Sequence, residues 1–212
     1  MRNPSVQDVY EPGSTGKVMT LAAAIEEKKI TPETVFTVPY ALKRSVKTFH
    51  DHEPHATQRL TASGILAVSS NTGSIKIGEM LSNDTLHNYL SKFGIGEKTG
   101  SGLPGESRGI LPKVADWSGT TAPTVAFGQG YSLTAMQATS VFATIANDGV
   151  RVSPTVIAGT SDASGNYTPS ATRESVRVVS AETAQKMRLM MESVVSANGT
   201  APTARSEERR VG

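Results

Sequence analysis

The amino-acid sequence predicts a domain of the α+β class that consists mainly of helices. Four segments place apolar residues at the three- and four-residue spacing of an amphipathic helix. Segments of β-like composition are short, and Pro39 and Pro54 interrupt the longest of them. The chain has 212 residues, of which 37% are hydrophobic and 19% charged, and it contains no repeat or low-complexity linker. These features together favour one globular domain.

The first predicted helix covers residues 14–30. Ser14 lies at its N-cap or in its first turn. One face of the helix is apolar, because apolar residues recur at positions i, i+3, i+4 and i+7. These residues are Val18, Leu21, Ala22 and Ile25.

The next part of the chain has weaker patterns. Residues 34–55 predict an irregular excursion with at most brief strands, and residues 61–81 predict two short apolar segments around a Ser-Ser-Asn turn. His50, His52 and His55 are close enough in the sequence to bind zinc as a cluster, but no scaffold or carboxylate pattern accompanies them. We therefore favour surface or structural histidines.

A second helix is expected over residues 82–96. Asn83 or Asp84 can cap its N-terminus, and Gly94 suits the left-handed position after its C-terminus. Its apolar stripe consists of Leu86, Tyr89, Leu90 and Phe93.

A third helix is expected over residues 131–150. Thr134 and Gln137 have the spacing of a capping box, and Gly149 marks the end of the helix. Its apolar face consists of Ala138, Val141, Phe142 and Ile145. Before this helix, Gly128 and Gly130 could cradle an anion, although we favour a turn that leads into the helix near the rim of the site.

The fourth helix is expected over residues 180–195, with Ser180 as its cap. Residues 150–170, which precede it, predict one or two strands joined by a polar Gly/Ser turn. Three methionines of the helix are interpreted as core residues rather than as a soft-metal or partner site. They are Met187, Met190 and Met191.

Composition excludes several classes of function. The formal net charge is only +2, aromatic residues make up 5%, and no Lys/Arg run is present, so a nucleic-acid binder is not expected. No apolar stretch approaches the roughly 18 residues of a membrane-spanning helix. The absence of cysteine excludes disulfides, thiolate metal sites and a cysteine nucleophile, but it does not indicate a compartment.

Ser14 and Lys17 form a Ser-x-x-Lys motif at the start of the first predicted helix. A serine hydroxyl needs a neighbouring base to act as a nucleophile, and a lysine three residues later lies on the same helix face. The lysine must be neutral to accept a proton, which requires burial or nearby positive charge. The alternative is an N-cap serine followed by a solvated lysine.

Ser69 and Asn71 form a second motif, Ser-x-Asn, in the Ser-Ser-Asn turn. Such a turn could bring a second hydroxyl and an amide to the Ser-x-x-Lys pair. The alternative is a Ser/Asn turn that only makes its own backbone hydrogen bonds. The two motifs together are more specific than either alone.

Longer stretches of the chain resemble a known family. They are YEPGSTGKVMTLAAAIE, HEPHATQRLTASGILAVSSNTGSIKI, LSKFGIGEKTGSGLPGE, TVAFGQGYSLTAMQATSVFATIANDGV and AETAQKMRLMMESVV. They resemble the transpeptidase domain of class B penicillin-binding proteins, peptidoglycan D,D-transpeptidases of the cell-division type, with an actinobacterial source suggested. The resemblance extends over residues 3–204. It implies the helix-rich part of the serine β-lactamase and penicillin-binding transpeptidase fold, with most of the central antiparallel sheet missing.

The resemblance implies a role for each motif residue. Ser14 would be the acylated nucleophile and Lys17 its proton acceptor. Ser69 would relay a proton to or from the leaving group, and Asn71 would hold the substrate's amide carbonyl or Lys17. The implied reaction is acyl transfer from the D-Ala-D-Ala end of a peptidoglycan stem peptide, and penicillin would acylate Ser14 as a mimic of that end. No metal or organic cofactor is implied.

The family has a third motif, Lys-Thr-Gly, which lies on a strand beside the substrate. Lys98, Thr99 and Gly100 carry these letters, but they follow a helix end in a stretch rich in glycine that lacks β-branched alternation. We therefore predict a loop here and do not count these residues as catalytic. The catalytic third motif is expected to lie outside this chain.

Both ends of the chain look incomplete. Residues 205–212, RSEERRVG, form a charged run that resembles a sequencing-adapter read-through, and they are interpreted as a non-native tail. Residues 1–204 are interpreted as a partial transpeptidase domain. The segment alone is expected to be inactive and poorly stable, because a surface made for the missing sheet would face water.

The resemblance also implies a setting for the full-length protein. It would be anchored to the cytoplasmic membrane by a segment upstream of this chain, lie outside the cytoplasm, and work with the division or elongation machinery. Two other function classes stay open. A serine β-lactamase would need a deacylating base, for which no pattern is visible, and a β-lactam sensor or interaction module would signal without turnover.

Overall fold

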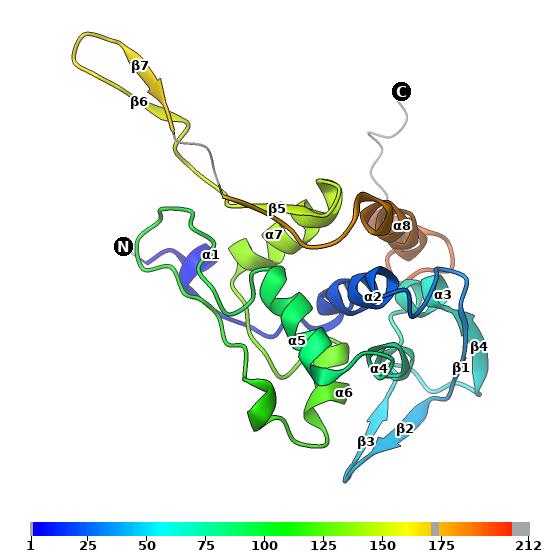
Figure 1. Cartoon of the computed structure of the whole chain (residues 1–212). Coiled ribbons are helices and arrows are strands. Elements are labelled where there is room, and N and C mark those ends of the chain that lie inside the picture. Colours follow the sequence, from blue (N-terminus) through cyan, green and yellow to red (C-terminus); the bar gives the residue numbers. More distant parts are fainter. Residues whose placement is uncertain (1, 171–173, 205–212) are drawn as a thin grey trace.

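Helices form the body of the molecule in the computed structural model, which describes residues 2–170 and 174–204 (Figure 1). The predicted α+β class, with helices dominant, is confirmed. The predicted tail, residues 205–212, lies outside the described residues. The helices are α1 (Pro4–Gln7), α2 (Lys17–Glu26), α3 (Ala62–Ala67), α4 (Asn71–Gly78), α5 (Asn83–Lys92), α6 (Thr121–Ala126), α7 (Ala135–Ala146) and α8 (Ala181–Glu192), with short 3-10 helices at Gly13–Gly16, Val114–Asp116, Ser193–Val195 and Pro202–Ala204.

The strands in the described ranges are short and pair in antiparallel twos. They are β1 (Val35–Val38), β2 (Ala41–Arg44), β3 (Lys47–His50), β4 (Gln58–Thr61), β5 (Val150–Val152), β6 (Gly159–Ser161), β7 (Tyr167–Pro169) and β8 (Ser175–Arg177). Strand β1 pairs with β4, β2 with β3, β5 with β8, and β6 with β7. The register places Val35 opposite Thr61, Ala41 opposite His50, Val150 opposite Arg177 and Gly159 opposite Pro169. The segment predicted as an irregular excursion therefore contributes the three brief strands β1 to β3.

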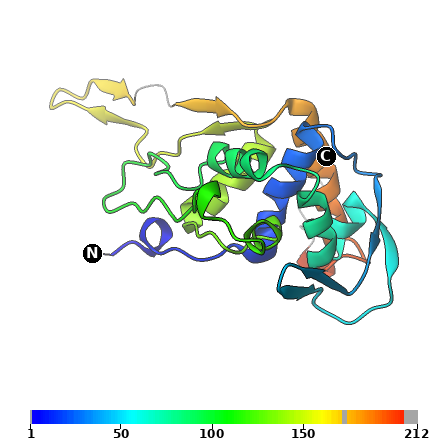
Figure 2. The same ribbon diagram turned by 60° about the horizontal axis from the view of Figure 1, so that its bottom comes forward.

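Helix α2 lies at the centre of the helical body, and the two ribbon views show other helices around it (Figures 1 and 2). It contacts α3, α4, α5 and α8. Every residue from Lys17 to Ile25 is buried, so the predicted apolar stripe is buried together with the rest of the helix. Small side chains such as Ala23 and Ala24 allow this close approach from several sides. No helix in the described part of the chain has the length and apolar character needed to cross a bilayer.

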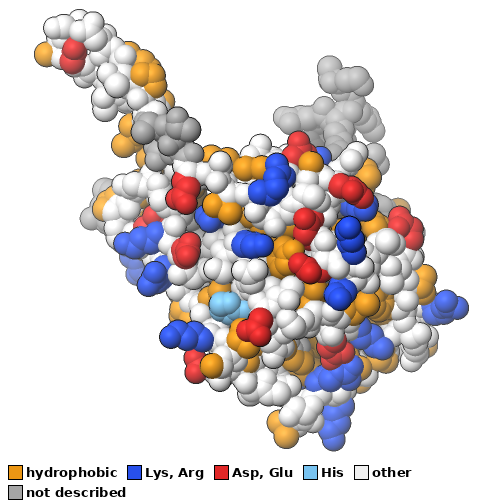
Figure 3. All heavy atoms as spheres, in the orientation of Figure 1, with side chains coloured by type: hydrophobic (Ala, Val, Ile, Leu, Met, Phe, Trp, Pro, Cys, Tyr) orange, Lys and Arg blue, Asp and Glu red, His pale blue; other side chains and the backbone are white. Residues whose placement is uncertain are grey.

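The β6–β7 hairpin projects away from the helical body in both ribbon views and forms an arm in the space-filling view (Figures 1, 2 and 3). Its turn is held by the Asp162 carboxylate, which accepts hydrogen bonds from the backbone N–H groups of Ser164 and Asn166. The apolar side chains of Ile157 and Tyr167 are exposed on this arm. The polar turn predicted for residues 150–170 is confirmed, but the segment contains three strands, β5, β6 and β7, where one or two were predicted.

The N-terminus of α5 differs from the prediction. Ser82, not Asn83 or Asp84, is the N-cap, and its Oγ accepts a hydrogen bond of 3.1 Å from the backbone N–H of Thr85. Ser82 has an extended backbone whereas Asn83 is already helical, so the helix begins one residue earlier than a cap at Asn83 would place it. Gly94 follows the helix with a φ of +96°, as predicted.

Helices α7 and α8 have the predicted caps. Thr134 and Gln137 form a complete capping box, and the Oγ of Ser180 caps α8. Phe142 differs from the prediction. It was expected on the buried apolar face, but it is 38% exposed. Helix α7 packs against the core through the helix face that carries Val141 and Ile145, and Phe142 lies beside that face. Among the predicted core methionines, Met187 and Met190 are buried and Met191 is partly buried against the core.

Candidate active site

Ser14 and Lys17 meet at the start of the central helix. Ser14 lies in the 3-10 turn Gly13–Gly16, which leads directly into α2, and Lys17 is the first residue of α2. The Lys17 Nζ donates a hydrogen bond of 3.1 Å to the Ser14 Oγ. The three-residue spacing therefore places both side chains on the same side of the turn.

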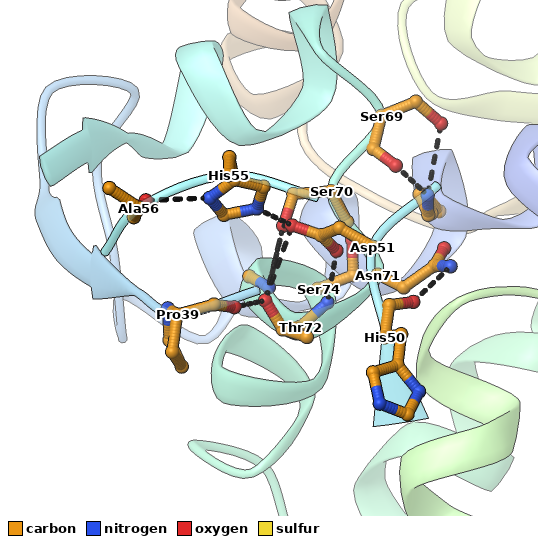
Figure 4. A network of polar contacts seen from close by, with 12 residues as sticks. Pro39, His50, Asp51, His55, Ala56, Ser69, Ser70, Asn71, Thr72 and Ser74 are labelled. Carbon is orange, nitrogen blue, oxygen red and sulfur yellow. Dashed lines mark hydrogen bonds and ion pairs between the residues drawn. The ribbon is translucent and has the colours of Figure 1, made fainter. Parts of the chain in front are cut away.

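Ser69 is the second serine whose side chain contacts the Lys17 ammonium. It lies between α3 and α4, and its carbonyl oxygen and Oγ lie 2.5 Å and 3.0 Å from the Lys17 Nζ (Figure 4). Ser69 has a φ of +57°, a left-handed conformation that costs a non-glycine residue about 1–2 kcal/mol. In this conformation the carbonyl oxygen and the Oγ of Ser69 both point toward the Lys17 Nζ.

Lys17 is fully buried, with 0% of its surface exposed. Burial disfavours the charged ammonium and is the larger influence, while the negative charge of Asp51 acts in the opposite direction, and together they lower the pKa of Lys17 to about 8. At pH 7 about a tenth of the lysine is then neutral, compared with a negligible fraction for an exposed lysine. A neutral Lys17 can accept a proton from a serine hydroxyl.

Asn71 is the first residue of α4, and its Nδ2 donates a hydrogen bond of 3.0 Å to the carbonyl oxygen of His50. The amide group is therefore oriented by the end of strand β3. Asn71 and Ser14 both line two adjoining cavities of about 500 Å³ and about 390 Å³. Ser69, Asp51 and Val68 also line the larger cavity. These volumes fall in the usual range for a ligand site, and the Ser14 hydroxyl is accessible from both.

Asp51 is the site residue that sequence reasoning missed. Its carboxylate accepts hydrogen bonds from the Ser70 Oγ at 2.7 Å and from the Thr72 backbone N–H at 2.8 Å, on either side of Asn71 (Figure 4). The side chain is only 8% exposed. Nothing local in the sequence marks this residue, because its partners lie 19 and 21 positions further along the chain.

The three histidines around Asp51 do not form a cluster. The His55 Nε2 donates to Asp51 at 3.0 Å, His50 packs against the Tyr40 ring, and the side chain of His52 is 94% exposed. Over residues 2–170 and 174–204, no group of three or more His, Cys, Asp or Glu side chains is placed to hold a metal ion.

The glycines before α7 bind another part of the chain. The Gly13 N–H donates to the Gly128 carbonyl at 2.8 Å, and the Gly130 N–H donates to the Glu11 carboxylate at 2.8 Å. The Gly130 amide therefore already has an anionic partner within the protein. This turn abuts the residue before Ser14, and its side chains Phe127 and Gln129 line the smaller cavity.

Lys98, Thr99 and Gly100 lie in the loop that follows α5, as predicted. The Thr99 backbone N–H donates to the Glu106 carboxylate at 2.7 Å, and its hydroxyl donates to the same carboxylate. These bonds close the loop on itself. None of the three residues lines either cavity at Ser14.

Comparison with known proteins adds independent evidence. The family model of the penicillin binding protein transpeptidase domain matches residues 1–212. The chain is 39% identical to penicillin-binding protein PbpB of Mycobacterium tuberculosis over 208 residues, which are 95% of this chain and 31% of that protein. It is 35% identical to peptidoglycan D,D-transpeptidase FtsI of Escherichia coli over 154 residues, which are 71% of this chain and 25% of that protein. The chain thus spans about a quarter to a third of the length of these curated relatives.

Solved structures show the same similarity in three dimensions. Penicillin binding protein 3 of Mycobacterium tuberculosis, complexed with aztreonam, is 38% identical and superposes with a TM-score of 0.92 over 96% of this chain and 47% of that one. The complex of that protein with ampicillin gives a TM-score of 0.93 with coverage of 96% and 46%. The fold that the sequence resemblance implies is therefore confirmed.

Proposed function

The chain belongs to the penicillin-binding protein transpeptidase family, and we propose that it is part of a peptidoglycan D,D-transpeptidase that works by serine acyl transfer. The observation that carries the proposal is the buried Lys17, whose Nζ lies within hydrogen-bonding distance of the hydroxyls of both Ser14 and Ser69. The Nζ of the proposed base, Lys17, thus contacts both the proposed nucleophile, Ser14, and a second hydroxyl, that of Ser69.

In the first half of the proposed reaction, the Ser14 Oγ attacks the carbonyl carbon of the penultimate D-Ala of a stem peptide. Neutral Lys17 accepts the hydroxyl proton as the new C–O bond forms. The C–N bond to the terminal D-Ala then breaks, and the proton passes from Lys17, by way of the Ser69 hydroxyl, to the leaving amine. The product is an acyl-enzyme on Ser14.

In the second half, the amine of a neighbouring stem peptide attacks the acyl-enzyme and releases Ser14, while its proton returns through the same groups. Asn71 lines the cavities at Ser14 and is proposed to hold the amide carbonyl of the substrate. A β-lactam would acylate Ser14 as its ring opens. The complexes of a similar protein with aztreonam and ampicillin support β-lactams as ligands of this site.

The proposal extends to the setting of the full-length protein. We place it outside the cytoplasm, anchored to the cytoplasmic membrane, where it acts with the division or elongation machinery on peptidoglycan. The similarity to a peptidoglycan D,D-transpeptidase and to penicillin-binding proteins supports this setting.

A fluorescent penicillin tests the proposal on the full-length gene product that carries this segment. We expect stable labelling of the wild type and of Ser5→Ala, which alters an exposed serine of α1, and no labelling of Ser14→Ala. Labelling should rise with pH through about 8, because Lys17 must lose its proton. Labelling of Ser14→Ala that equals the wild type would refute Ser14 as the nucleophile, and rapid release of the label would indicate a β-lactamase instead.

A further inference from the structure

We propose that Asp51 is a positioning residue of this site, which holds the Ser69–Asn71 turn against Lys17 and supplies the negative charge that faces this lysine. The inference rests on the proposed function, and it assigns a role to a residue outside the two motifs. Asp51 follows strand β3 directly and is held there by its own backbone N–H, which donates to the Tyr40 carbonyl at 3.0 Å.

His50 at the end of β3 and Asp51 just after it hold three consecutive residues at the start of α4, Ser70 to Thr72 (Figure 4). The Asp51 carboxylate accepts hydrogen bonds from the Ser70 hydroxyl and the Thr72 N–H. The His50 carbonyl accepts one from the Asn71 side-chain amide. The Ser70 Oγ in turn accepts the Gly73 N–H at 2.9 Å and caps α4. The start of α4 is thus fixed from outside the helix.

This fixation explains how Ser69 keeps its left-handed backbone. A serine at a φ of +57° has a strained backbone, and an isolated turn would relax. The charge-assisted hydrogen bonds to Asp51 are stronger than neutral ones and offset this strain. The carboxylate also lies at the N-terminus of α4, where the helix dipole favours negative charge.

The charge of Asp51 has a separate effect on Lys17. It favours the ammonium form and so acts against burial, which lowers the pKa of that lysine. Both ring nitrogens of His55 face acceptors, Asp51 and the Ala56 carbonyl, and these bonds raise the pKa of His55. Only the protonated form of His55 offsets part of the Asp51 charge. The other titratable side chains that line the two cavities are Lys47, His50, His52 and Glu53.

The two effects can be separated by Asp51→Asn. An asparagine keeps an oxygen for the Thr72 N–H, and its amide N–H can donate to the Ser70 Oγ in place of the bond that Ser70 donates to Asp51, but it has no charge. We therefore expect D51N to reach a plateau rate of penicillin acylation close to that of the wild type, with the half-plateau point at lower pH. A displacement of half a pH unit would raise the neutral fraction of Lys17, and the rate at pH 7, about threefold.

Asp51→Glu provides the opposite change, because it keeps the charge and displaces the bonds. Its plateau rate should fall while the half-plateau pH stays that of the wild type. If D51N does not fold, the isosteric pair D51E and Asp51→Gln gives the same comparison of charge at matched length. Asp84→Asn, an exposed carboxylate on α5, is the matched control and should change neither quantity.

The measurement is the rate of acylation by a fluorescent penicillin between pH 6 and 10, on the full-length gene product. An unchanged half-plateau pH in D51N, or in D51Q relative to D51E, would overturn the inference, because a purely structural role does not move the titration. Absence of wild-type acylation at Ser14 would instead overturn the proposed function. The two failures are therefore distinguishable.

Discussion

Replacing Gln137 by methionine should destabilise the protein by about 2–4 kcal/mol, because this buried side chain joins α7 to the loop after α5. The side chain is 1% exposed. Its Nε2 donates to the carbonyls of Gly94, Glu97 and Arg108 at 3.0, 2.8 and 2.9 Å, and its Oε1 accepts the Thr134 N–H at 2.8 Å.

The magnitude follows from these contacts. Methionine has nearly the volume of glutamine, so the cavity contribution is small, and the loss comes from hydrogen bonds alone. Two N–H groups serve three carbonyls, and with the bond to Thr134 about three net hydrogen bonds of about 0.5–1.5 kcal/mol each are lost. The carbonyls left without a donor lie in the segment that contains Lys98–Gly100.

Urea unfolding and thermal melting of the purified full-length gene product measure this change, and in a domain of about 150–250 residues the melting temperature falls by about 2–4 °C per kcal/mol. Gln185→Met, at an exposed position of α8, makes the same substitution without buried partners and should change stability by less than about 0.5 kcal/mol. A Q137M protein within about 1 kcal/mol of the wild type would refute the reasoning.

Two further substitutions test the close packing beside Ser14. The Tyr131 hydroxyl is buried and has no hydrogen-bond partner among the described residues, so Tyr131→Phe should leave the unfolding free energy unchanged or raise it by about 1 kcal/mol; a clear loss in urea unfolding would show that the hydroxyl has a partner. Gly128 has a φ of +91°, and a Cβ there would fall on the Gly13 carbonyl, so Gly128→Ala should cost about 2 kcal/mol or more and slow acylation of Ser14. Gly102→Ala shares the positive φ but meets nothing within 4 Å, so it should cost only about 1 kcal/mol and leave acylation unchanged; equal losses from both substitutions would contradict the proposed clash.

Four of the helices, α2, α5, α7 and α8, could be predicted because their signals are local. The capping box of Thr134 and Gln137, the Ser180 cap and the glycine after α5 each lie within one turn of the helix end that they mark. The exposure of Phe142 could not be predicted in the same way. It depends on which neighbours α7 packs against, and a helical repeat of apolar residues carries no information about them.

The candidate site was predictable only in part, for the same reason. Ser14 and Lys17 are one helical turn apart, so their contact follows from spacing alone. The burial that lowers the pKa of Lys17 depends on four surrounding helices, and the contact with Ser69 depends on a turn 52 residues away. Asp51 has no local signal of its role, because its partners Ser70 and Thr72 belong to another element of the chain.

Contacts across such distances along the chain make the site a property of the complete tertiary structure. The bond between Lys17 and Ser69 and the bond between Asp51 and Ser70 span 52 and 19 residues, and neither can persist once the helices separate. A ligand that reacts covalently with Ser14 would thus react with native molecules only. It would also trap each molecule in its folded state and draw the unfolded population toward it, as any ligand specific for the native state does. A β-lactam would then act as a pharmacological stabiliser of the protein that it inactivates.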